Sequence, residues 1–396
     1  MINGLRLFVA GTHFRVFPFN AYQRGEIAAM QKTLPSRRQF LHGSLQVTAL
    51  LVFLSISALQ LQAASPLGDL MVFSPVQGEK IARPSKADSD DEIEIPKYEH
   101  IILDTPDGVR LKCTYFAPPK VKDAAEDAPK KPAMPFILLH DWEGDRRQLL
   151  KYGLFLQKSG HAVIVPDLRG HGQSVSVEGL KKPLDYKKFR KQEVMSAQKD
   201  IERCKKFLVQ KHNQGEVNID LLSVVAVGET SVLAVQWILN DWFAFPSHNP
   251  QGIKQGQDVK SLMLVSPVKK LAGVSMVNNI QHPLFTSVDG SGAMPMLVLW
   301  SSFEKTAKES KEIAEILGKH RPDVSKIEDK AERLKASELI EITTKKNRLT
   351  GVEMLENSKV NNLWKAITVR LFENKVAANA EQFPWITREV DSGEDE

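Results

Sequence analysis

The amino-acid sequence predicts an α/β fold with a mostly parallel central sheet, an N-terminal antiparallel hairpin, helices on both faces and no large lid. Short apolar runs recur along the chain, and a stretch with helical spacing separates each run from the next. Such runs are typical of parallel strands that are buried on both faces of a sheet. The first regular segment differs, because its two runs alternate apolar and polar residues around a turn, which predicts a hairpin.

The hairpin is expected at residues 98–104 and 109–116, which flank the turn signal Pro106-Asp107-Gly108. The parallel strands share an apolar core between turn residues, and we expect them at 136–140, 162–166, 222–228, 261–267, 296–300 and 339–344. Apolar side chains recur at helical spacing between these strands, which predicts helices at 146–158, 186–212, 304–319 and 359–374. The segments 241–260 and 271–295 are too short for a separate helical lid.

Residues 1–65 are expected to be an export segment. The motif Ser36-Arg37-Arg38-Gln39-Phe40-Leu41 precedes an uncharged, moderately apolar run from residue 45 to 61, and small residues follow that run. This order resembles a twin-arginine signal peptide. The apolar run is short for a bilayer span, which needs about 20 residues. The sequence therefore predicts export to the periplasm or envelope of a bacterial cell, with membrane association through residues 45–61 left open if the segment stays uncleaved.

The boundary at residue 65 also divides the chain into a basic part and a neutral part. Residues 1–65 carry six Lys or Arg and one Glu, which accounts for the whole-chain net charge of +5. The remaining chain has 47 basic and 47 acidic residues and is formally neutral. A nucleic-acid-binding domain has a basic excess of its own, so nucleic acid is excluded as a partner.

The export segment is followed by an acidic, extended linker at 66–97, a folded domain at 98–374 and a polar, acidic tail at 375–396. Cys113 and Cys204 are predicted to be small buried residues, and whether they form a disulfide stays open. No His or Cys spacing indicates a metal site, and no cofactor is expected.

Two motifs carry a resemblance to a known family. Leu138-Leu139-His140-Asp141 is similar to the H-G segment after the first parallel strand of α/β-hydrolases. Asp167-Leu168-Arg169-Gly170-His171-Gly172-Gln173-Ser174 closely resembles the D-x-R-G-x-G-x-S turn after the next strand. The resemblance extends from about Tyr98 to Leu371, and it implies the α/β-hydrolase fold. Within the second motif, Asp167, Arg169 and His171 are expected to hold their own turn together.

The resemblance also implies catalytic positions, and these carry unsuitable residues. Residues 221–240 form a strand, a turn and a helix, where G-x-S-x-G is expected. Counting two residues from Gly228 places Thr230 at the nucleophile position and Val232 at the second glycine, and a β-branched residue is disfavoured at both. The acid position reads Glu304, after the strand at 296–300, and the base position reads Thr350. Backbone N–H groups near Asp141 and Ser231 are the expected oxyanion side.

Each candidate has an ordinary structural interpretation that we favour. The hydroxyls of Thr230 and Ser231 are expected to cap a helix. Glu304 is expected to be a carboxylate in the first turn of a helix. His140 is expected to be a hydrogen-bonded structural residue. Only His320 follows Glu304 among the histidines, and it precedes the last strand instead of following it.

The sequence therefore predicts an exported α/β-hydrolase-like protein without a complete Ser-His-Asp triad, a non-catalytic binding or structural member with an unidentified small-molecule or protein partner. Two alternatives stay open. The first is an active esterase or peptidase that uses Ser231 or Thr230 with a relocated base such as His140 or His171. The second is an envelope scaffold that acts through the acidic linker and tail. Two polar groups converging in a cleft would favour the enzyme, and a filled, apolar cleft would favour the scaffold.

Overall fold

The computed structural model describes residues 93–121, 133–243, 256–287, 293–329, 332–333, 336–337, 339–344, 348–357, 361–383 and 385–388. The expected export segment, with its arginine pair and its apolar run, lies outside these residues, as do most of the expected linker and the end of the tail. Among the described helices, none combines the length and the apolar character that a membrane span requires.

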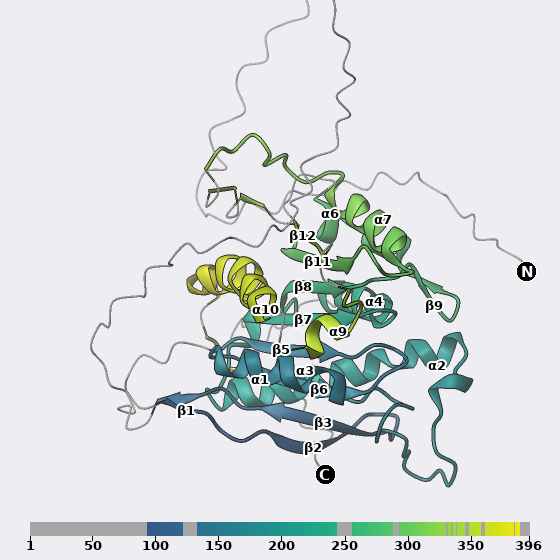
Figure 1. The fold of residues 1–396 in the computed structure, drawn as a ribbon. Helices are drawn as coiled ribbons and strands as arrows, with labels where there is room; N and C mark the ends of the chain where they lie inside the picture. Colours follow the sequence, from purple (N-terminus) through teal and green to yellow (C-terminus); the bar gives the residue numbers. More distant parts are fainter. Residues whose placement is uncertain are drawn as a thin grey trace, which may run out of the picture. The chain divides into compact units, whose positions relative to one another are not determined.

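An eight-stranded sheet forms the centre of the domain, in the order β12-β11-β8-β7-β5-β6-β3-β2. The six strands that pair in parallel are β5 (Pro135–Leu139), β6 (Ala162–Pro166), β7 (Leu222–Val227), β8 (Val259–Val265), β11 (Met296–Ser301) and β12 (Leu339–Thr344). The expected hairpin is formed by β2 (Glu99–Asp104) and β3 (Arg110–Phe116), and β3 also pairs antiparallel with β6. Figure 1 shows this hairpin at one edge of the sheet, in dark blue. The predicted fold class is confirmed.

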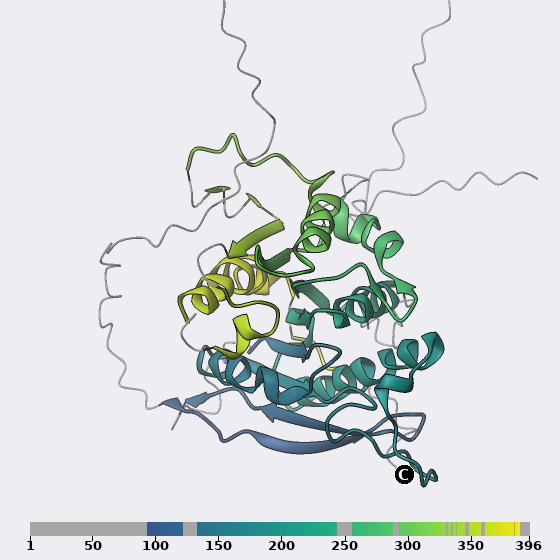
Figure 2. The ribbon, with the colours of Figure 1, turned by 45° about the vertical axis from the view of Figure 1, so that its right-hand side comes forward.

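Helices cover both faces of the sheet (Figures 1 and 2). One core lies between the sheet and the helices α3 (Gln198–Asn213), α4 (Thr230–Phe243) and α7 (Ala307–Gly318). The second core lies between the sheet and α1 (Leu150–Lys158), α9 (Glu353–Glu356), α10 (Asn361–Ile367) and the π-helical η5 (Thr368–Val376). Residues of β5 alternate between the two cores, as strand geometry requires, so that every side chain of this strand is buried.

The long helix expected at 186–212 is divided into three elements, which are η2 (Tyr186–Lys188), α2 (Lys191–Ser196) and α3. Phe189 and Arg190 have extended backbone between the first two, so the expected single helix is interrupted there. The shorter elements are β1 (Ile93–Glu94), β4 (Lys120–Val121), η1 (Arg146–Leu149), η3 (Ile219–Leu221), β9 (Lys270–Leu271), β10 (Val274–Ser275), α5 (Val277–Ile280), α6 (Pro283–Thr286) and η6 (Ala377–Gln382).

Folded structure extends beyond both of the domain limits that we expected from the sequence. Strand β1 pairs antiparallel with β4, so paired structure begins before residue 98. At the other end, Lys375 is buried, and the buried Arg388 forms ion pairs with Asp220 (2.6 Å) and Asp258 (3.1 Å). The interpretation of a polar tail from residue 375 is therefore wrong for the part that ends at Arg388. The Arg388 guanidinium reaches two carboxylates on the domain, which composition does not reveal.

Two ion-pair networks hold the turn after β6 and position the loops at this end of the sheet. The buried carboxylate of Asp167 accepts from the backbone N–H of Arg146 (2.8 Å) and from Gln173 (2.9 Å), and it pairs with the Arg146 guanidinium. The Arg169 guanidinium bonds Asp200 through Nη2 (2.7 Å) and Asp107 through Nη1 (2.7 Å). Asp167 thus holds its own turn together as expected, whereas the Arg169 side chain joins the turn to Asp107 and Asp200 outside it.

Candidate functional site

The strand-to-helix turn between β7 and α4 is centred on Gly228. This residue has φ +58°, a left-handed conformation that residues with a side chain rarely adopt, and its N–H donates to the carbonyl of Val265 (2.8 Å). The strained backbone conformation that we expected at Thr230 therefore occurs two residues earlier, at Gly228. Thr230 is the first residue of α4, and Val232 lies inside the first turn of that helix, packed in the first core.

The two hydroxyls after the turn are buried and satisfied locally. Thr230 donates to the carbonyl of Val227 (2.8 Å), and Ser231 donates to the carbonyl of Gly228 (2.6 Å). Both side chains are fully buried, so neither hydroxyl is exposed to solvent. The expectation that they cap the helix is wrong in its direction, because a capping oxygen accepts from an N–H and these hydroxyls donate to carbonyls.

Asp141 fills the space in which a side chain at position 228 would lie. A Cβ on Gly228 would be 2.3 Å from Oδ1 of Asp141, far inside van der Waals contact. Asp141 follows β5 through His140, and the carboxyl ends of β5 and β7 are neighbours in the sheet, which brings the two segments together. The strained position of the turn therefore carries no side chain, and the neighbouring Asp141 leaves no space for one.

The electrostatic surroundings of Asp141 include Glu229, the next residue of the turn. Burial first, and then the neighbouring Glu229 carboxyl, raise the pKa of Asp141 to about 7. Oδ1 of Asp141 is buried without a hydrogen-bond partner among the described residues. Sequence reasoning named Asp141 only for its backbone and did not find Glu229.

One of the expected oxyanion donors is engaged within the turn. The N–H of Ser231 donates to the carbonyl of Gly228 within the turn (3.2 Å). An oxyanion site needs donors that are directed at the developing charge, and the N–H of Ser231 is already engaged.

Glu304 joins three loops at the carboxyl end of the sheet. Its Oε1 accepts from the N–H of Ser301 (2.7 Å), the hydroxyl of Ser266 (2.7 Å) and the N–H of Gly351 (3.3 Å). Glu304 lies before α7, so it is not the first-turn carboxylate that we expected. The contact with Gly351 shows that the expected acid and base segments do meet. Ser266, at φ +50°, is a site residue that the sequence did not indicate.

Thr350 does not face Glu304. Its N–H (3.0 Å) and its hydroxyl (3.3 Å) both donate to Oε2 of Glu353, at the start of α9. A threonine side chain has no group that takes up a proton near neutral pH, and this one is held by a structural contact. The described part of the chain therefore has an acid position at Glu304 without a base beside it.

The two histidines considered as relocated bases are occupied. His140 accepts from the N–H of Leu168 at Nε2 (3.1 Å), so its proton is on Nδ1, which donates to the carbonyl of Asp141 (2.7 Å). Burial is the main cause that lowers the pKa of His140 to about 3. His171 has carbonyl partners at both ring nitrogens and stacks on Tyr186 at 4.0 Å. The structural interpretation of His140 is confirmed.

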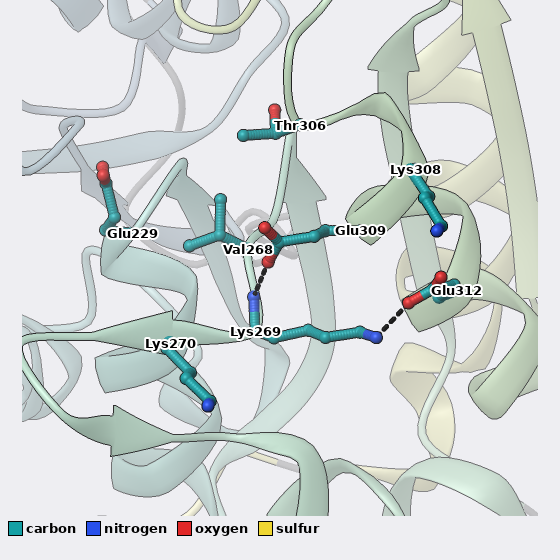
Figure 3. A pocket seen from close by; sticks show the side chains of 8 residues that line it. All are labelled: Glu229, Val268, Lys269, Lys270, Thr306, Lys308, Glu309 and Glu312. Atoms are coloured by element: carbon teal, nitrogen blue, oxygen red, sulfur yellow. Dashed lines mark hydrogen bonds and ion pairs between the residues drawn. The ribbon is translucent and has the colours of Figure 1, made fainter.

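A polar cavity of about 560 Å³ opens beside the turn (Figure 3). It is lined by residues of the turn, of the segment after β8 and of the start of α7, namely Glu229, Val268, Lys269, Lys270, Thr306, Lys308, Glu309 and Glu312. Two of the glutamates are engaged by one lysine, because the N–H of Lys269 donates to Glu309 (2.8 Å) and its Nζ pairs with Glu312. Glu229, which lines this cavity, directly follows Gly228 in the turn.

No group of three or more His, Cys, Asp or Glu within the described residues is arranged to hold a metal ion. Cys113 and Cys204 are buried free thiols in the first core. The exposed His320 follows α7 and is not part of the site.

No model of a known protein family matches the chain, and no curated protein sequence matches it. Solved structures similar to it include an esterase of Pyrococcus furiosus, at 12% identity over 70% of this chain and 91% of that one, with a TM-score of 0.45. A carboxylesterase cloned from a metagenomic library is 12% identical over 72% and 90%, with a TM-score of 0.43. A serine hydrolase of Xanthomonas campestris described as having no lid is 11% identical over 73% and 96%, with a TM-score of 0.41.

The strand order in the sheet carries the assignment of the fold. An antiparallel hairpin is followed by six parallel strands, and the turn from the central strand β7 into α4 lies at their carboxyl ends. With this order and with helices on both faces, the chain is an α/β-hydrolase-fold protein.

Proposed function

We propose that this chain is an exported, non-catalytic binding member of the α/β-hydrolase fold. The observation that carries the proposal is Gly228. In a nucleophile elbow the nucleophile occupies the strained residue of the strand-to-helix turn. The left-handed residue of this turn is Gly228, so we infer that the nucleophile position carries glycine and that Ala226 and Thr230 take the places of the two motif glycines.

The surroundings of Gly228 support the same conclusion. Nucleophilic hydrolysis needs an oxygen or sulfur atom that a neighbouring base activates. Gly228 has neither atom, and the Asp141 carboxylate occupies the space. Thr350 at the base position is bonded to Glu353, so restoring a nucleophile alone would leave it without activation.

The cavity beside the turn supports binding. It lies where open α/β sheets bind ligands, beyond the carboxyl ends of the strands. Six of its eight lining residues are charged, which favours a polar small molecule or peptide segment over an apolar acyl chain. This composition also differs from the filled, apolar cleft that a scaffold role would favour.

We expect the purified protein to hydrolyse p-nitrophenyl acetate and butyrate no faster than an inert protein at equal concentration. A fluorophosphonate probe should leave its mass unchanged. Thr230→Ser should not alter either result, because residue 230 lies in the helix and its hydroxyl is committed to Val227. Turnover by the unmodified protein that Thr230→Ala or Ser231→Ala abolishes would overturn the proposal and favour the enzyme with a displaced nucleophile.

A rebuilt site tests the assignment of positions within the same experiment. The triple variant Asp141→Gly, Gly228→Ser, Thr350→His clears the space, supplies a nucleophile at the strained residue and adds a base in the loop that Glu304 contacts. Its matched control, Thr230→Ser, Val232→Gly, Thr350→His, places the nucleophile in the helix. We expect probe labelling of the first variant, within residues 222–243, and none of the second.

Export rests on the arginine motif and is tested separately. We expect the double change Arg37→Lys, Arg38→Lys to leave precursor in the cytoplasm of a bacterial host that has a twin-arginine pathway, because that pathway requires the pair. Cell fractionation and immunoblotting measure the distribution. Arg15→Lys with Arg24→Lys is the matched control and should export normally. Unchanged export of the Arg37/Arg38 variant would remove the twin-arginine interpretation.

A further inference from the structure

The C-terminal segment, meaning residue 383 and residues 385–388, is bound at the end of the sheet opposite the candidate functional site. It contacts the end of α3 and the residues that precede β7 and β8, which is where these strands begin. Residues 385–388 belong to no helix or strand, and the side chains of Trp385 and Ile386 are 45% and 40% exposed. These two apolar side chains therefore contribute little burial to holding the segment.

Side chains of α3 bind the backbone of this segment. Asn213 pairs with Arg388 in both directions, since its Nδ2 donates to the carbonyl (2.8 Å) and its Oδ1 accepts from the N–H (2.8 Å). Nε2 of His212 lies 2.7 Å from the carbonyl oxygen of Ile386, which only accepts, so the ring donates its proton there. The indole N–H of Trp385 donates to the carbonyl of His212 (3.0 Å). Main-chain hydrogen bonds of this kind are how proteins bind extended peptides.

The domain itself orients the side chains that bind the segment. Nδ1 of His212 accepts from the N–H of Ile219 (3.2 Å), on the side of the ring away from the segment. Oδ1 of Asn218 accepts from the N–H of Asp220 (3.1 Å), while its Nδ2 donates to the carbonyl of Phe383 (2.7 Å). Both side chains are buried. The groove is thus organised by bonds that do not involve the segment, and a preorganised site binds its ligand at a lower entropic cost.

The side chain of Arg388 lies in a buried acidic pocket of this groove. Its Nη2 is 2.6 Å from Oδ2 of Asp220 and 3.1 Å from Oδ1 of Asp258. Around the arginine, the described residues supply three carboxylates and two ammonium groups, which are those of Asp220, Asp241, Asp258, Lys205 and Lys260. Without the arginine this group has a formal charge of −1. Because a buried carboxylate without its cation is costly, the pocket favours a ligand with one positive charge.

We propose that this groove is a peptide-binding site for an extended peptide that carries an arginine, and that the C-terminal segment of the same chain occupies it as a detachable ligand. The hydrogen bonds to the backbone hold the extended conformation, and the acidic pocket selects the arginine. When the segment detaches, the pocket is open to another peptide of the same chemistry. The inference does not depend on the proposed function, because the groove and the cavity lie at opposite ends of the strands.

A nicked form of the full-length protein tests whether the segment behaves as a ligand. A recognition sequence for a site-specific protease is inserted between Gln382 and Phe383, and the folded protein is cleaved there. We expect a labelled peptide with the sequence of residues 383–390 to bind the nicked protein in place of the cleaved segment. Fluorescence anisotropy measures the binding, which should be saturable and should be reversed by the unlabelled peptide.

Variants of the labelled peptide test the acidic pocket. Arg388→Lys keeps the charge but loses the planar guanidinium that bridges two carboxylates, and it should weaken binding at least about tenfold. Thr387→Ala is the matched control, because the Thr387 side chain is exposed, and it should leave the affinity unchanged. Asp220→Asn in the nicked protein should weaken binding of the unchanged peptide.

Hydrogen exchange of the uncut chain tests the same proposal if the nicked protein does not fold. A detachable ligand opens locally, so the N–H of Arg388 should exchange faster than the N–H groups of β7. Asp220→Asn weakens the side-chain contact of Arg388 and leaves the acceptor of its N–H in place, so it should raise this rate without changing that of β7. Thr387→Ala in the uncut chain should change neither rate.

Three results would overturn the proposal. The first is the absence of saturable binding to a nicked protein that is folded. The second is equal affinity for the arginine and lysine peptides. The third is exchange of the Arg388 N–H only together with the N–H groups of β7, which would show that the segment does not detach by itself. None of these measurements involves catalysis or the cavity, so failure of the proposed function would leave them unaffected.

Discussion

Gly228→Ala is expected to lower the free energy of unfolding by about 3 kcal/mol, measured as a shift in the urea midpoint. Two costs add. An alanine at φ +58° is strained by about 1–2 kcal/mol, and inserting an atom into filled space costs about 1–3 kcal/mol. The added Cβ would lie 2.3 Å from Oδ1 of Asp141 and 2.9 Å from its Cγ, so one group has to move.

A second glycine separates the two costs. Gly215 has φ +76°, and an added Cβ would meet nothing within 4 Å. Gly215→Ala therefore reports the strain alone and should cost about 1 kcal/mol. Combining Gly228→Ala with Asp141→Gly removes the clash, and we expect a favourable coupling above about 1 kcal/mol in the double-mutant cycle. A loss at Gly228 that equals the loss at Gly215 would show that Asp141 does not fill the space.

Arg169→Ala is expected to be the most destabilising single change, at about 3–5 kcal/mol, because it leaves the fully buried carboxylate of Asp200 without its cation. Asp200 accepts from the guanidinium through Oδ1 (2.7 and 2.9 Å) and from the Arg169 N–H through Oδ2 (2.7 Å). The guanidinium also holds the pKa of Asp107 below its usual range, against the opposing effect of burial. Urea unfolding at pH 7 measures the loss.

The arginine–aspartate pair of Arg147 and Asp145 is the matched control. The Arg147 side chain is 81% exposed, and water screens the pair, so Arg147→Ala should leave the midpoint unchanged. The Arg169→Ala effect should also be smaller at acidic pH, because burial raises the pKa of Asp200 and a protonated Asp200 does not need the cation. Equal effects of the two changes would contradict a buried network at the turn.

The sequence predicted the fold because burial on both faces of a sheet leaves a pattern that is local. Each parallel strand is an apolar run, and the ends of all eight predicted strands of the sheet agree with the structure to within two residues. The sequence analysis missed the break in the helix at 186–212, where the backbone is extended at Phe189 and Arg190. The packing of Arg388 was missed for a related reason, since its partners Asp220 and Asp258 are far away in sequence.

The sequence by itself determined that this protein has an α/β-hydrolase-like order of elements and that Ser-His-Asp residues are absent from the expected spacing. Only the tertiary structure decided which residue occupies the strained turn and what surrounds it. The pattern G-x-S-x-G can be aligned with the sequence of this turn in two ways. The positive φ of Gly228 favours the alignment that places residue 228 at the nucleophile position. The approach of Asp141 to Gly228, 87 residues apart in the chain, depends on β5 and β7 lying side by side, and that contact is a property of the sheet.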